Sequence, residues 1–262
     1  MLTLPAALRR LPVVRSVYRR VMRVWKRLRF RRDFVAFRRM SHSAGDTRFS
    51  LLWRDRLAFL DDSTASTGFD RHYVYHTAWA ARVLAQLKPH EHVDISSSLF
   101  FCGLVSAFVR MRFYDYRPPA LELDNLAVDR ADLTCLPFAD GSIASLSYMH
   151  VIEHVGLGRY GDPLQVNGDL LALRELQRVV APGGSLLLVV PVGRPRIQFN
   201  AHRIYSQRQI LQEFPAANWD LRQSALIPAE STSVGLLLGA SCEQVEGEDC
   251  ACGCYWFQKR GG

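Results

Sequence analysis

The feature that most constrains this chain is an alternation of short apolar segments with helical stretches, which begins at His92. The apolar segments lie at residues 92–95, 111–116, 143–150 and 185–190. Such alternation is typical of a parallel sheet with helices on both faces. Between the predicted helix 168–180 and the last of these strands stands Ala-Pro-Gly-Gly, which favours a helix-to-strand turn. The expected fold class is therefore α/β, with a doubly wound and mostly parallel sheet.

The length of 262 residues and a hydrophobic content of 48% suit one α/β domain with a modest extension. We expect three parts: a basic amphipathic helix over residues 1–40, a helical lead-in over 41–90 and the α/β domain over 91–260. Within the lead-in, Asp46 is a candidate cap for a first helix. A second helix is expected from His72 to Leu87, ending before a proline.

The basic character of the chain is confined to its N-terminal segment. Residues 1–39 hold 13 Lys or Arg and one acid, whereas the remainder holds 20 basic and 24 acidic residues. Apolar residues recur there at intervals of three and four, with basic residues between them: Leu4, Leu8, Leu11, Val14, Tyr18, Val21, Trp25 and Leu28. This pattern predicts an amphipathic helix that begins near Pro12.

Two uses of this helix remain open. It could lie on an anionic membrane surface, with its apolar face among the headgroups and its arginines on the phosphates. It could instead pack on its own domain or on a partner, or bind nucleic acid. The pattern favours a membrane or partner surface, because an apolar stripe has no evident use on nucleic acid and the rest of the chain is net acidic.

No run of 18 apolar residues occurs, so no membrane-spanning segment is predicted. Arginines interrupt any stretch that could act as a secretory signal. We therefore expect a cytoplasmic protein that attaches peripherally to the inner face of the membrane, with free thiols. Cys250, Cys252 and Cys254 would share one face of a strand, and their spacing favours core residues over metal ligands.

A turn and an acid predict where a nucleotide-like ligand would bind. The first strand ends in Ser96-Ser97-Ser98 and leads into an apolar helix over 99–109. In a doubly wound sheet, the turn after the first strand contacts such a ligand. The second strand ends at Asp115, about 20 residues after Asp94, where an acid can accept hydrogen bonds from both hydroxyls of a ribose.

The run ADLTCLPFADGSIASLSYMHVIEHVGLGRYGDP (131–163), followed by ELQRVVAPGGSLLLVVPVG (175–193), resembles class I methyltransferases of the type 11 group. Together with NAHRIYS (200–206) and CGCYWFQK (252–259), it resembles the methyltransferase-like family called domain of unknown function 268. The resemblance covers about residues 90–258. It implies a seven-stranded sheet whose last strand, near Cys252 to Gln258, is antiparallel, and it implies S-adenosylmethionine as cofactor.

The resemblance also implies a set of cofactor-binding residues near the ends of the first four strands: Asp94, Ser96, Ser98, Asp115, Tyr116, Asp132, Leu133 and His150. Asp115 would hold the ribose, Asp132 and Leu133 would meet the adenine, and His150 would face the sulfonium. The serines would line the methionine end, together with Asp94. One departure stands out, because Ser96, Ser98 and Phe100 occupy positions where such methyltransferases usually carry glycine.

The sequence His150-Val-Ile-Glu153-His154 has two interpretations. His154 or His202 could act as the general base, because a neutral imidazole can take a hydroxyl proton near pH 7. Alternatively, His150, Glu153 and His154 could share one helical face and bind a divalent metal, with His202 as a fourth ligand. Similar Glu-x-x-Glu-His patterns bind metal in some O-methyltransferases. The metal interpretation is the less favoured, since many type 11 members carry a similar motif without one.

Two polar loops, residues 156–169 and 193–206, follow the fourth and fifth strands, where the acceptor is held in this architecture. The candidate acceptor-binding residues are Arg159, Tyr160, Asn200 and Arg203. Arginines there suggest an acidic or phosphorylated acceptor. An equally open interpretation is that Arg159 and Asp162 only hold the loop in place.

Two functions follow. The favoured one is an S-adenosylmethionine-dependent methyltransferase acting on an oxygen or nitrogen of a small or glycan-type acceptor. The alternative is a catalytically inactive binding module of the same fold at a membrane surface. Ser96 and Phe100 favour the module, whereas the retained acids Asp94, Asp115 and Asp132 favour the enzyme.

Overall fold

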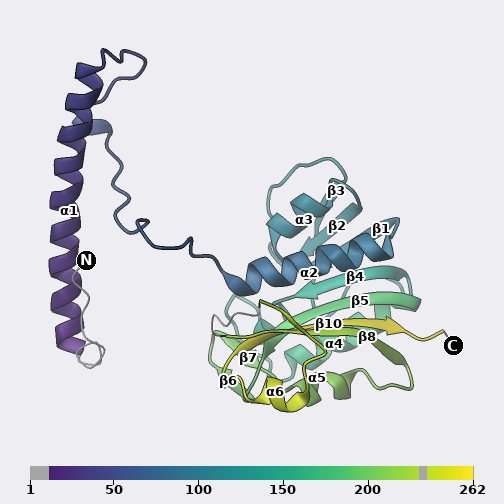
Figure 1. Cartoon of the computed structure of the whole chain (residues 1–262). Helices are drawn as coiled ribbons and strands as arrows, with labels where there is room; N and C mark the ends of the chain where they lie inside the picture. The colour runs from purple at the N-terminus through teal and green to yellow at the C-terminus, as the bar shows by residue number, and fades with distance from the viewer. Residues whose placement is uncertain (1–11, 230–234, 262) are drawn as a thin grey trace. The chain divides into compact units, whose positions relative to one another are not determined.

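The computed structural model describes residues 12–229 and 235–261 (Figure 1). The chain divides into two compact units, residues 1–68 and 69–262. The predicted apolar positions Leu4, Leu8 and Leu11 lie outside the described residues. Within those residues, none of the helices combines the length and the apolar character needed to cross a membrane.

The first unit is built on one long helix, α1 (Pro12–Ser43). Pro12 is also the first residue that the structure describes, so the predicted start of the helix near this proline stays a prediction. Downstream of α1, the ring of Trp53 packs edge-on against Phe34, with ring centroids 4.9 Å apart. Eight large apolar side chains of α1 are exposed, and four of them recur at helical spacing along one stripe: Val17, Val21, Val24 and Leu28.

The helix predicted from Asp46 is wrong. Between residues 44 and 70, all of which are described, the only helical element is the three-residue η2 (Trp53–Asp55). The Asp46 carboxylate accepts a hydrogen bond from the backbone N–H of Arg48, at 3.1 Å, and so caps a turn rather than a helix. Residues 61–70 are all exposed, so a helix there would bury no apolar face, and short helices need such packing.

The second unit begins with α2 (Arg71–Leu87), which confirms the predicted second helix. The side chain of Asp70 caps it by accepting from the N–H of Tyr73 at 3.1 Å. Its buried face consists of His76, Trp79, Ala80, Val83 and Leu84. The indole N–H of Trp79 donates to Gln223 at 2.8 Å, so α2 belongs to the α/β unit rather than to a separate lead-in.

The sheet of this unit has eight strands in the order β3-β2-β1-β4-β5-β10-β8-β9. The strands are β1 (Glu91–Ile95), β2 (Arg110–Asp115), β3 (Leu126–Arg130), β4 (Ile143–Met149), β5 (Val180–Val192), β8 (Trp219–Ile227), β9 (Leu237–Leu238) and β10 (Ala251–Lys259). The pairings from β3 to β5 are parallel, and β10 is antiparallel to both β5 and β8. The doubly wound, mostly parallel fold and the antiparallel last strand are therefore confirmed. The expected seven strands become eight, because the two-residue β9 pairs with the edge of β8.

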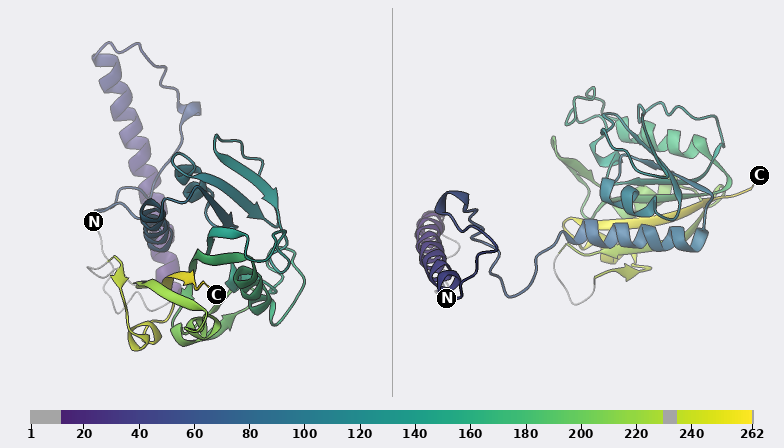
Figure 2. Two further views of the ribbon diagram at one scale, coloured as in Figure 1. Left: turned by 90° about the vertical axis from the view of Figure 1, so that its right-hand side faces the viewer. Right: turned by 90° about the horizontal axis from the view of Figure 1, so that it is seen from above.

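Helices cover both faces of the sheet: α3 (Leu99–Val105), α4 (Gly168–Val179), α5 (Gln207–Glu213) and α6 (Cys242–Glu246) join α2. Leu186, Leu188 and Val190 of β5 point into the core cluster that contains α4 and α5, and the intervening Leu187 and Val189 point into the cluster with α2 and α3. Figure 2 shows α2 running along one face of the sheet. On that face, β10 contributes its alternate side chains Cys252, Cys254 and Trp256 to the core. The predicted shared face is confirmed for Cys252 and Cys254, whereas Cys250 precedes β10 and is only partly buried.

Two short elements lie near the carboxyl ends of the central strands. The 3-10 helix η3 (Ile152–His154) follows β4, and the hairpin of β6 (Arg196–Gln198) and β7 (His202–Ile204) follows β5. They bring the predicted histidines to the same edge of the sheet as the predicted carboxylates.

Candidate active site

A cavity of about 370 Å³ opens at the carboxyl edge of the parallel strands. Its size lies within the range of small-molecule sites. The lining residues come from the ends of β1, β2 and β4 and from the loops that follow: Ser96, Asp115, Tyr116, Arg117, Asp132, Leu133, Thr134, His150, Val151, His154, Val155, Gly156, Tyr160, Asp162, Pro163 and Gln165.

The cofactor side of this cavity carries two fixed carboxylates. Asp115, at the end of β2, accepts a hydrogen bond from the backbone N–H of Arg117 at 2.7 Å. Asp132 accepts from the backbone N–H and the hydroxyl of Thr134, at 2.8 and 2.7 Å. Both side chains are held by their own turns, which orients them before any ligand binds. The predicted cofactor residues that line the cavity are Ser96, Asp115, Tyr116, Asp132, Leu133 and His150.

The first turn keeps the shape of a glycine turn although it carries serine. Ser96 has a φ of 56°, in the left-handed region that glycine favours. Its backbone N–H donates to the carbonyl of Tyr114 at 2.8 Å. Phe100 is 87% exposed on α3 and does not line the cavity. The missing glycines therefore leave the cavity open. Ser98, predicted to touch the cofactor, instead precedes α3 as its N-cap and lies outside the lining.

Asp94 is placed differently from the prediction. It is fully buried, and it accepts hydrogen bonds from the hydroxyl of Ser147 and from the backbone N–H of Ser97. The imidazole of His92 lies beside it, with Nε2 at 2.8 Å from the same Ser147 hydroxyl. Burial raises the pKa of Asp94 to about 6 and lowers the pKa of His92 to about 3. Asp94 thus supports the turn from behind instead of lining the cavity.

His154, which follows β4, also lines the cavity. Its Nδ1 lies 2.7 Å from the carbonyl of Ala201, which fixes the proton on Nδ1 and leaves the lone pair on Nε2. Burial lowers the pKa of His154, although the nearby carboxylate of Glu153 opposes this shift. Nε2 of His154 lies 3.8 Å from Oε1 of Glu153. The imidazole can therefore take a proton near pH 7, and the carboxylate can stabilise the resulting charge.

His202 stands beside His154 but away from the cavity. The two ring centroids are 6.4 Å apart, and His202 is not among the lining residues. Its Nε2 is buried and has no hydrogen-bond partner among the described residues. Burial lowers the pKa of His202 as well. Of the two predicted bases, His154 alone borders the cavity.

Tyr160 is the one predicted acceptor-binding residue that lines the cavity. Its ring stands edge-on to His154, with centroids 5.5 Å apart, and the guanidinium carbons of Arg117 and Arg159 lie 4.8 and 5.1 Å from its centroid. Arg159 also donates to the carbonyl of Ala201 at 3.0 Å, which ties its loop to the loop after β6. Asn200 is exposed and lies outside the lining.

Arg203 is buried and holds two loops together, contrary to the prediction that it binds the acceptor. It is 6% exposed, and its guanidinium donates to the carbonyls of Val155 and Val166 at 2.7 and 3.1 Å. The Asp169 carboxylate lies 3.6 Å from its Nε. Asp162 likewise holds the loop, since it accepts from the backbone N–H of Gly156 at 2.8 Å.

The structure also uses Glu153 differently from the predicted metal set. Its Oε1 lies 3.0 Å from Nδ1 of His150, so the carboxylate is hydrogen-bonded to a histidine instead of standing beside it as a ligand. Nε2 of the same histidine lies 3.3 Å from the sulfur of Cys252. His76 of α2, which the sequence did not single out, has its ring centroid 5.0 Å from that of His150. Its position on the apolar face of α2 was the one available signal.

Comparison with known proteins agrees with this geometry. Residues 141–219 match the family described as "Caenorhabditis protein of unknown function, DUF268". The resemblance to domain of unknown function 268 is confirmed over these residues. The matched segment runs from β4 to the start of β8 and includes η3 and α4, and hence His150, Glu153 and His154. No curated protein matches the chain.

Solved structures of methyltransferases share the fold. The N-methyltransferase NodS from Bradyrhizobium japonicum, in complex with S-adenosyl-L-homocysteine, is 12% identical. Its match covers 76% of this chain and 92% of NodS, with a TM-score of 0.51. A putative sarcosine dimethylglycine methyltransferase from Galdieria sulphuraria is 13% identical, with 71% and 86% covered and a TM-score of 0.50. At such identities the likeness shows the fold alone, which is that of class I methyltransferases.

Proposed function

We propose that this protein is an S-adenosylmethionine-dependent methyltransferase that acts on an oxygen or nitrogen of a small or glycan-type acceptor. The observation that carries the proposal is that one cavity is lined both by the fixed carboxylates of Asp115 and Asp132 and by the imidazole of His154. Asp115 would hold the ribose, Asp132 and Leu133 would contact the adenine, and the turn at Ser96 would face the methionine end.

The residues present fit this cofactor. Ser96 adopts the backbone conformation that glycine usually supplies, and the exposed Phe100 leaves the cavity unfilled. These two positions were the main argument for an inactive binding module. Their placement removes the steric objection to cofactor binding, and so favours the enzyme.

The cofactor, when bound, supplies an electrophilic methyl group. The chain then has to remove a proton from the acceptor. Nε2 of His154 would accept the proton of the acceptor hydroxyl or amine as the acceptor bonds to the methyl carbon; the bond from that carbon to the cofactor's sulfur would break at the same time and leave a neutral thioether. The resulting imidazolium keeps its Nδ1 hydrogen bond to Ala201, and its positive charge lies beside the carboxylate of Glu153.

Isothermal titration with S-adenosylhomocysteine tests the cofactor half of the proposal. We expect the wild-type protein to bind with micromolar affinity, about −8 kcal/mol. Asp115→Ala should weaken binding by at least about tenfold, because the ribose hydroxyls lose their acceptor. Asp129→Ala is the matched control, since Asp129 is an exposed carboxylate of neighbouring β3 outside the cavity. A folded wild-type protein that fails to bind would favour the inactive module.

We also propose that α1 attaches the protein to an anionic membrane surface. Its exposed apolar side chains Val17, Val21, Val24 and Leu28 form one stripe, and 11 Lys or Arg stand against one acid in the helix. Such a helix suits the boundary between acyl chains and anionic headgroups.

Co-sedimentation of the full chain with phosphatidylserine vesicles tests this attachment. The double substitution Val21→Glu and Leu28→Glu should abolish binding, because both charges fall in the apolar stripe. Leu57→Glu changes an even more exposed residue of the same unit outside α1 and should bind like the wild type. Equal binding by all three proteins would contradict the proposed orientation, and no binding by the wild type would favour a protein partner.

A further inference from the structure

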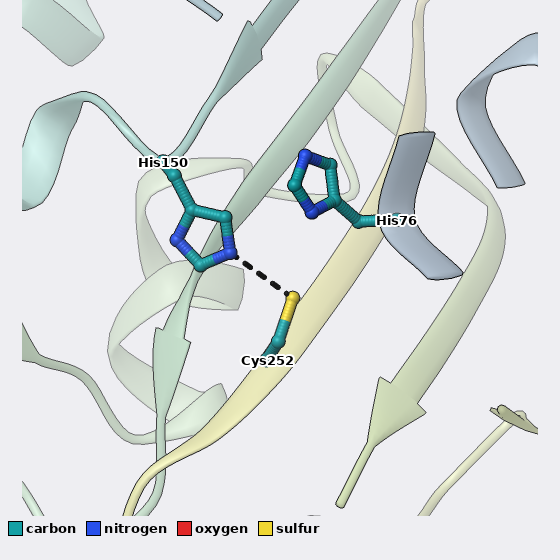
Figure 3. A group of neighbouring side chains, drawn as sticks. All are labelled: His76, His150 and Cys252. Carbon is teal, nitrogen blue, oxygen red and sulfur yellow. Dashed lines mark hydrogen bonds between the residues drawn. The ribbon is translucent and has the colours of Figure 1, made fainter. Parts of the chain in front are cut away.

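Three side chains from distant parts of the chain converge next to the cavity. They are His76 on α2, His150 after β4 and Cys252 on β10, and Figure 3 shows them facing one another from three separate elements. Their potential ligand atoms all lie within 4.8 Å of one another. From this convergence we propose that the three residues bind a divalent metal ion of the zinc type.

The donor set suits such an ion. Two imidazole nitrogens and one thiolate are ligands that zinc commonly takes, and soft sulfur disfavours magnesium or calcium. Neighbouring ligand atoms around a tetrahedral zinc lie about 3.3 to 3.8 Å apart. Nε2 of His150 and the sulfur of Cys252 already have this spacing, at 3.3 Å. The widest separation in the group exceeds it by about 1 Å, a movement within reach of a side-chain adjustment.

His150 is oriented as a metal ligand usually is. Its Nδ1 donates to Oε1 of Glu153 at 3.0 Å, which leaves the lone pair on Nε2, the nitrogen next to Cys252. A carboxylate behind the histidine fixes the tautomer and strengthens the ligand. The ring of Tyr73 stacks on the imidazole with centroids 5.7 Å apart, and this contact holds the plane of the ring.

His76 adds an imidazole that is completely buried. Its Nδ1 lies 2.6 Å from the carbonyl of His72, and its Nε2 has no hydrogen-bond partner among the described residues. An unsatisfied buried nitrogen costs about 1–3 kcal/mol, so the described arrangement leaves this ring short of one interaction. Binding requires the ring to rotate or to exchange its hydrogen bond to His72 for a bond to the ion.

Charge balance supports the same site. Glu153 is 1% exposed, and its Oε2 has no hydrogen-bond partner in the described parts of the chain. A buried carboxylate needs a compensating positive charge. A dication bound by one thiolate carries a net charge of +1, which the carboxylate of Glu153 neutralises through His150.

A metal ion would reach the three ligands through the cavity, and its fourth ligand would come from the same side. His150 lines the cavity, whereas His76 and Cys252 are buried behind it. Three protein ligands leave a fourth position on a tetrahedral ion, which water or a molecule in the cavity would complete.

Zinc titration of the chelator-treated full chain tests the proposal. We expect one equivalent to bind, measured by competition with a chromogenic chelator. Cys252→Ser and His76→Gln should each weaken binding by at least about 100-fold, because each removes a ligand. Cys254→Ser is the matched control: Cys254 is equally buried on the same face of β10 but outside the group, and its affinity should stay within about threefold of the wild type.

Cobalt provides a spectroscopic readout that does not involve methyl transfer, so it is independent of the proposed function. The cobalt-loaded wild type and Cys254→Ser should both show a thiolate-to-cobalt charge-transfer band in the near ultraviolet, and Cys252→Ser should lack it. Glu153→Gln should keep the band but weaken affinity by about 10- to 100-fold, as expected of a positioning residue.

Two outcomes would overturn the proposal. One is a folded wild-type protein that binds neither zinc nor cobalt. The other is binding of equal strength in the wild type, Cys252→Ser and His76→Gln, which would indicate adventitious ligands elsewhere. Circular dichroism checks folding of each variant. If Cys252→Ser does not fold, Cys252→Ala and His76→Asn serve instead, with the same expected losses.

Discussion

The two halves of the sheet's carboxyl edge differ in the environment of their carboxylates. The half formed by β1, β2 and β3 presents the carboxylates of Asp115 and Asp132, which border the cavity and keep some exposure to water. The half formed by β4, β5 and β10 concentrates histidines around Glu153, which is almost completely buried. A partly exposed carboxylate needs no fixed partner, whereas a buried one requires partners chosen by the fold. The proposed cofactor contacts of Asp115 and Asp132 lie in the first half, and the proposed base His154 lies in the second.

The largest expected effect separates chemistry from cofactor binding. His154→Ala should lower turnover by about 10²- to 10⁴-fold, because the acceptor proton loses its base. Affinity for S-adenosylhomocysteine should be little changed, since His154 is not among the residues assigned to the cofactor. Turnover is measured as S-adenosylhomocysteine released with an acceptor found by screening. His202→Ala is the comparison, and a loss confined to that variant would assign the base to His202.

The pH dependence of turnover sharpens the same contrast. Burial lowers the folded-state pKa of His154 below the ordinary value of 6.5. The base is neutral above its pKa, so activity should fall on the acid side with an apparent pKa below 6.5, by about tenfold per pH unit. A pH profile of kcat/KM checks this, and an acid limb above 6.5 would contradict a buried histidine as base.

The pH dependence of stability tests the environment of the buried Asp94, which supports the turn at Ser96. The pKa of Asp94 is raised to about 6, so the stabilisation from its protonated form is present below pH 3.8 and is lost as the pH rises through about 6. Asp94→Asn cannot ionise. We therefore compare the free energy of unfolding of Asp94→Asn with that of the wild type at each pH. This difference should be about 3 kcal/mol more favourable to the variant at pH 7 than at pH 3.

Urea unfolding at both pH values gives this difference. Asp129→Asn, which removes an exposed carboxylate, should show almost no such shift. Equal shifts in the two variants would show that burial does not control the ionisation of Asp94.

The smallest expected effect tests the first turn. Ser96→Gly should stabilise the protein by about 0.5–1 kcal/mol, because serine pays a steric penalty at positive φ that glycine avoids. Ser98 has a φ of −75°, so Ser98→Gly should instead destabilise by a similar amount. The midpoints of urea unfolding report both changes. Destabilisation by both substitutions would mean that the Ser96 side chain contributes more than its conformation costs.

The contrast between the two halves also explains what the sequence could predict. Asp115 stands at the end of β2, so local periodicity was enough to place it at the cavity, whereas Asp132 was placed there only through the family resemblance. Arg203 was misassigned because a loop arginine resembles a substrate contact until its carbonyl partners are visible. The helix expected at Asp46 failed because a capping residue alone does not supply an apolar face to bury.

The group of His76, His150 and Cys252 could not be predicted from local sequence patterns. His150 and Cys252 are 102 residues apart, and only the pairing of β10 with β5 brings them together. Cys252 and Cys254 were correctly assigned to one buried face, but a sequence pattern does not show what lies opposite that face.

The central position of β10 has a kinetic consequence. It pairs with β5 across long sequence separations, as between Cys252 and Pro191 or Gln258 and Ser185, and it also pairs with β8 on its other side. Closing such long loops slows folding. Until β10 docks, β5 and β8 each present an unpaired edge that another chain can join. The yield of refolding should therefore fall steeply as protein concentration rises, even though β10 covers both of these strand edges in the finished sheet.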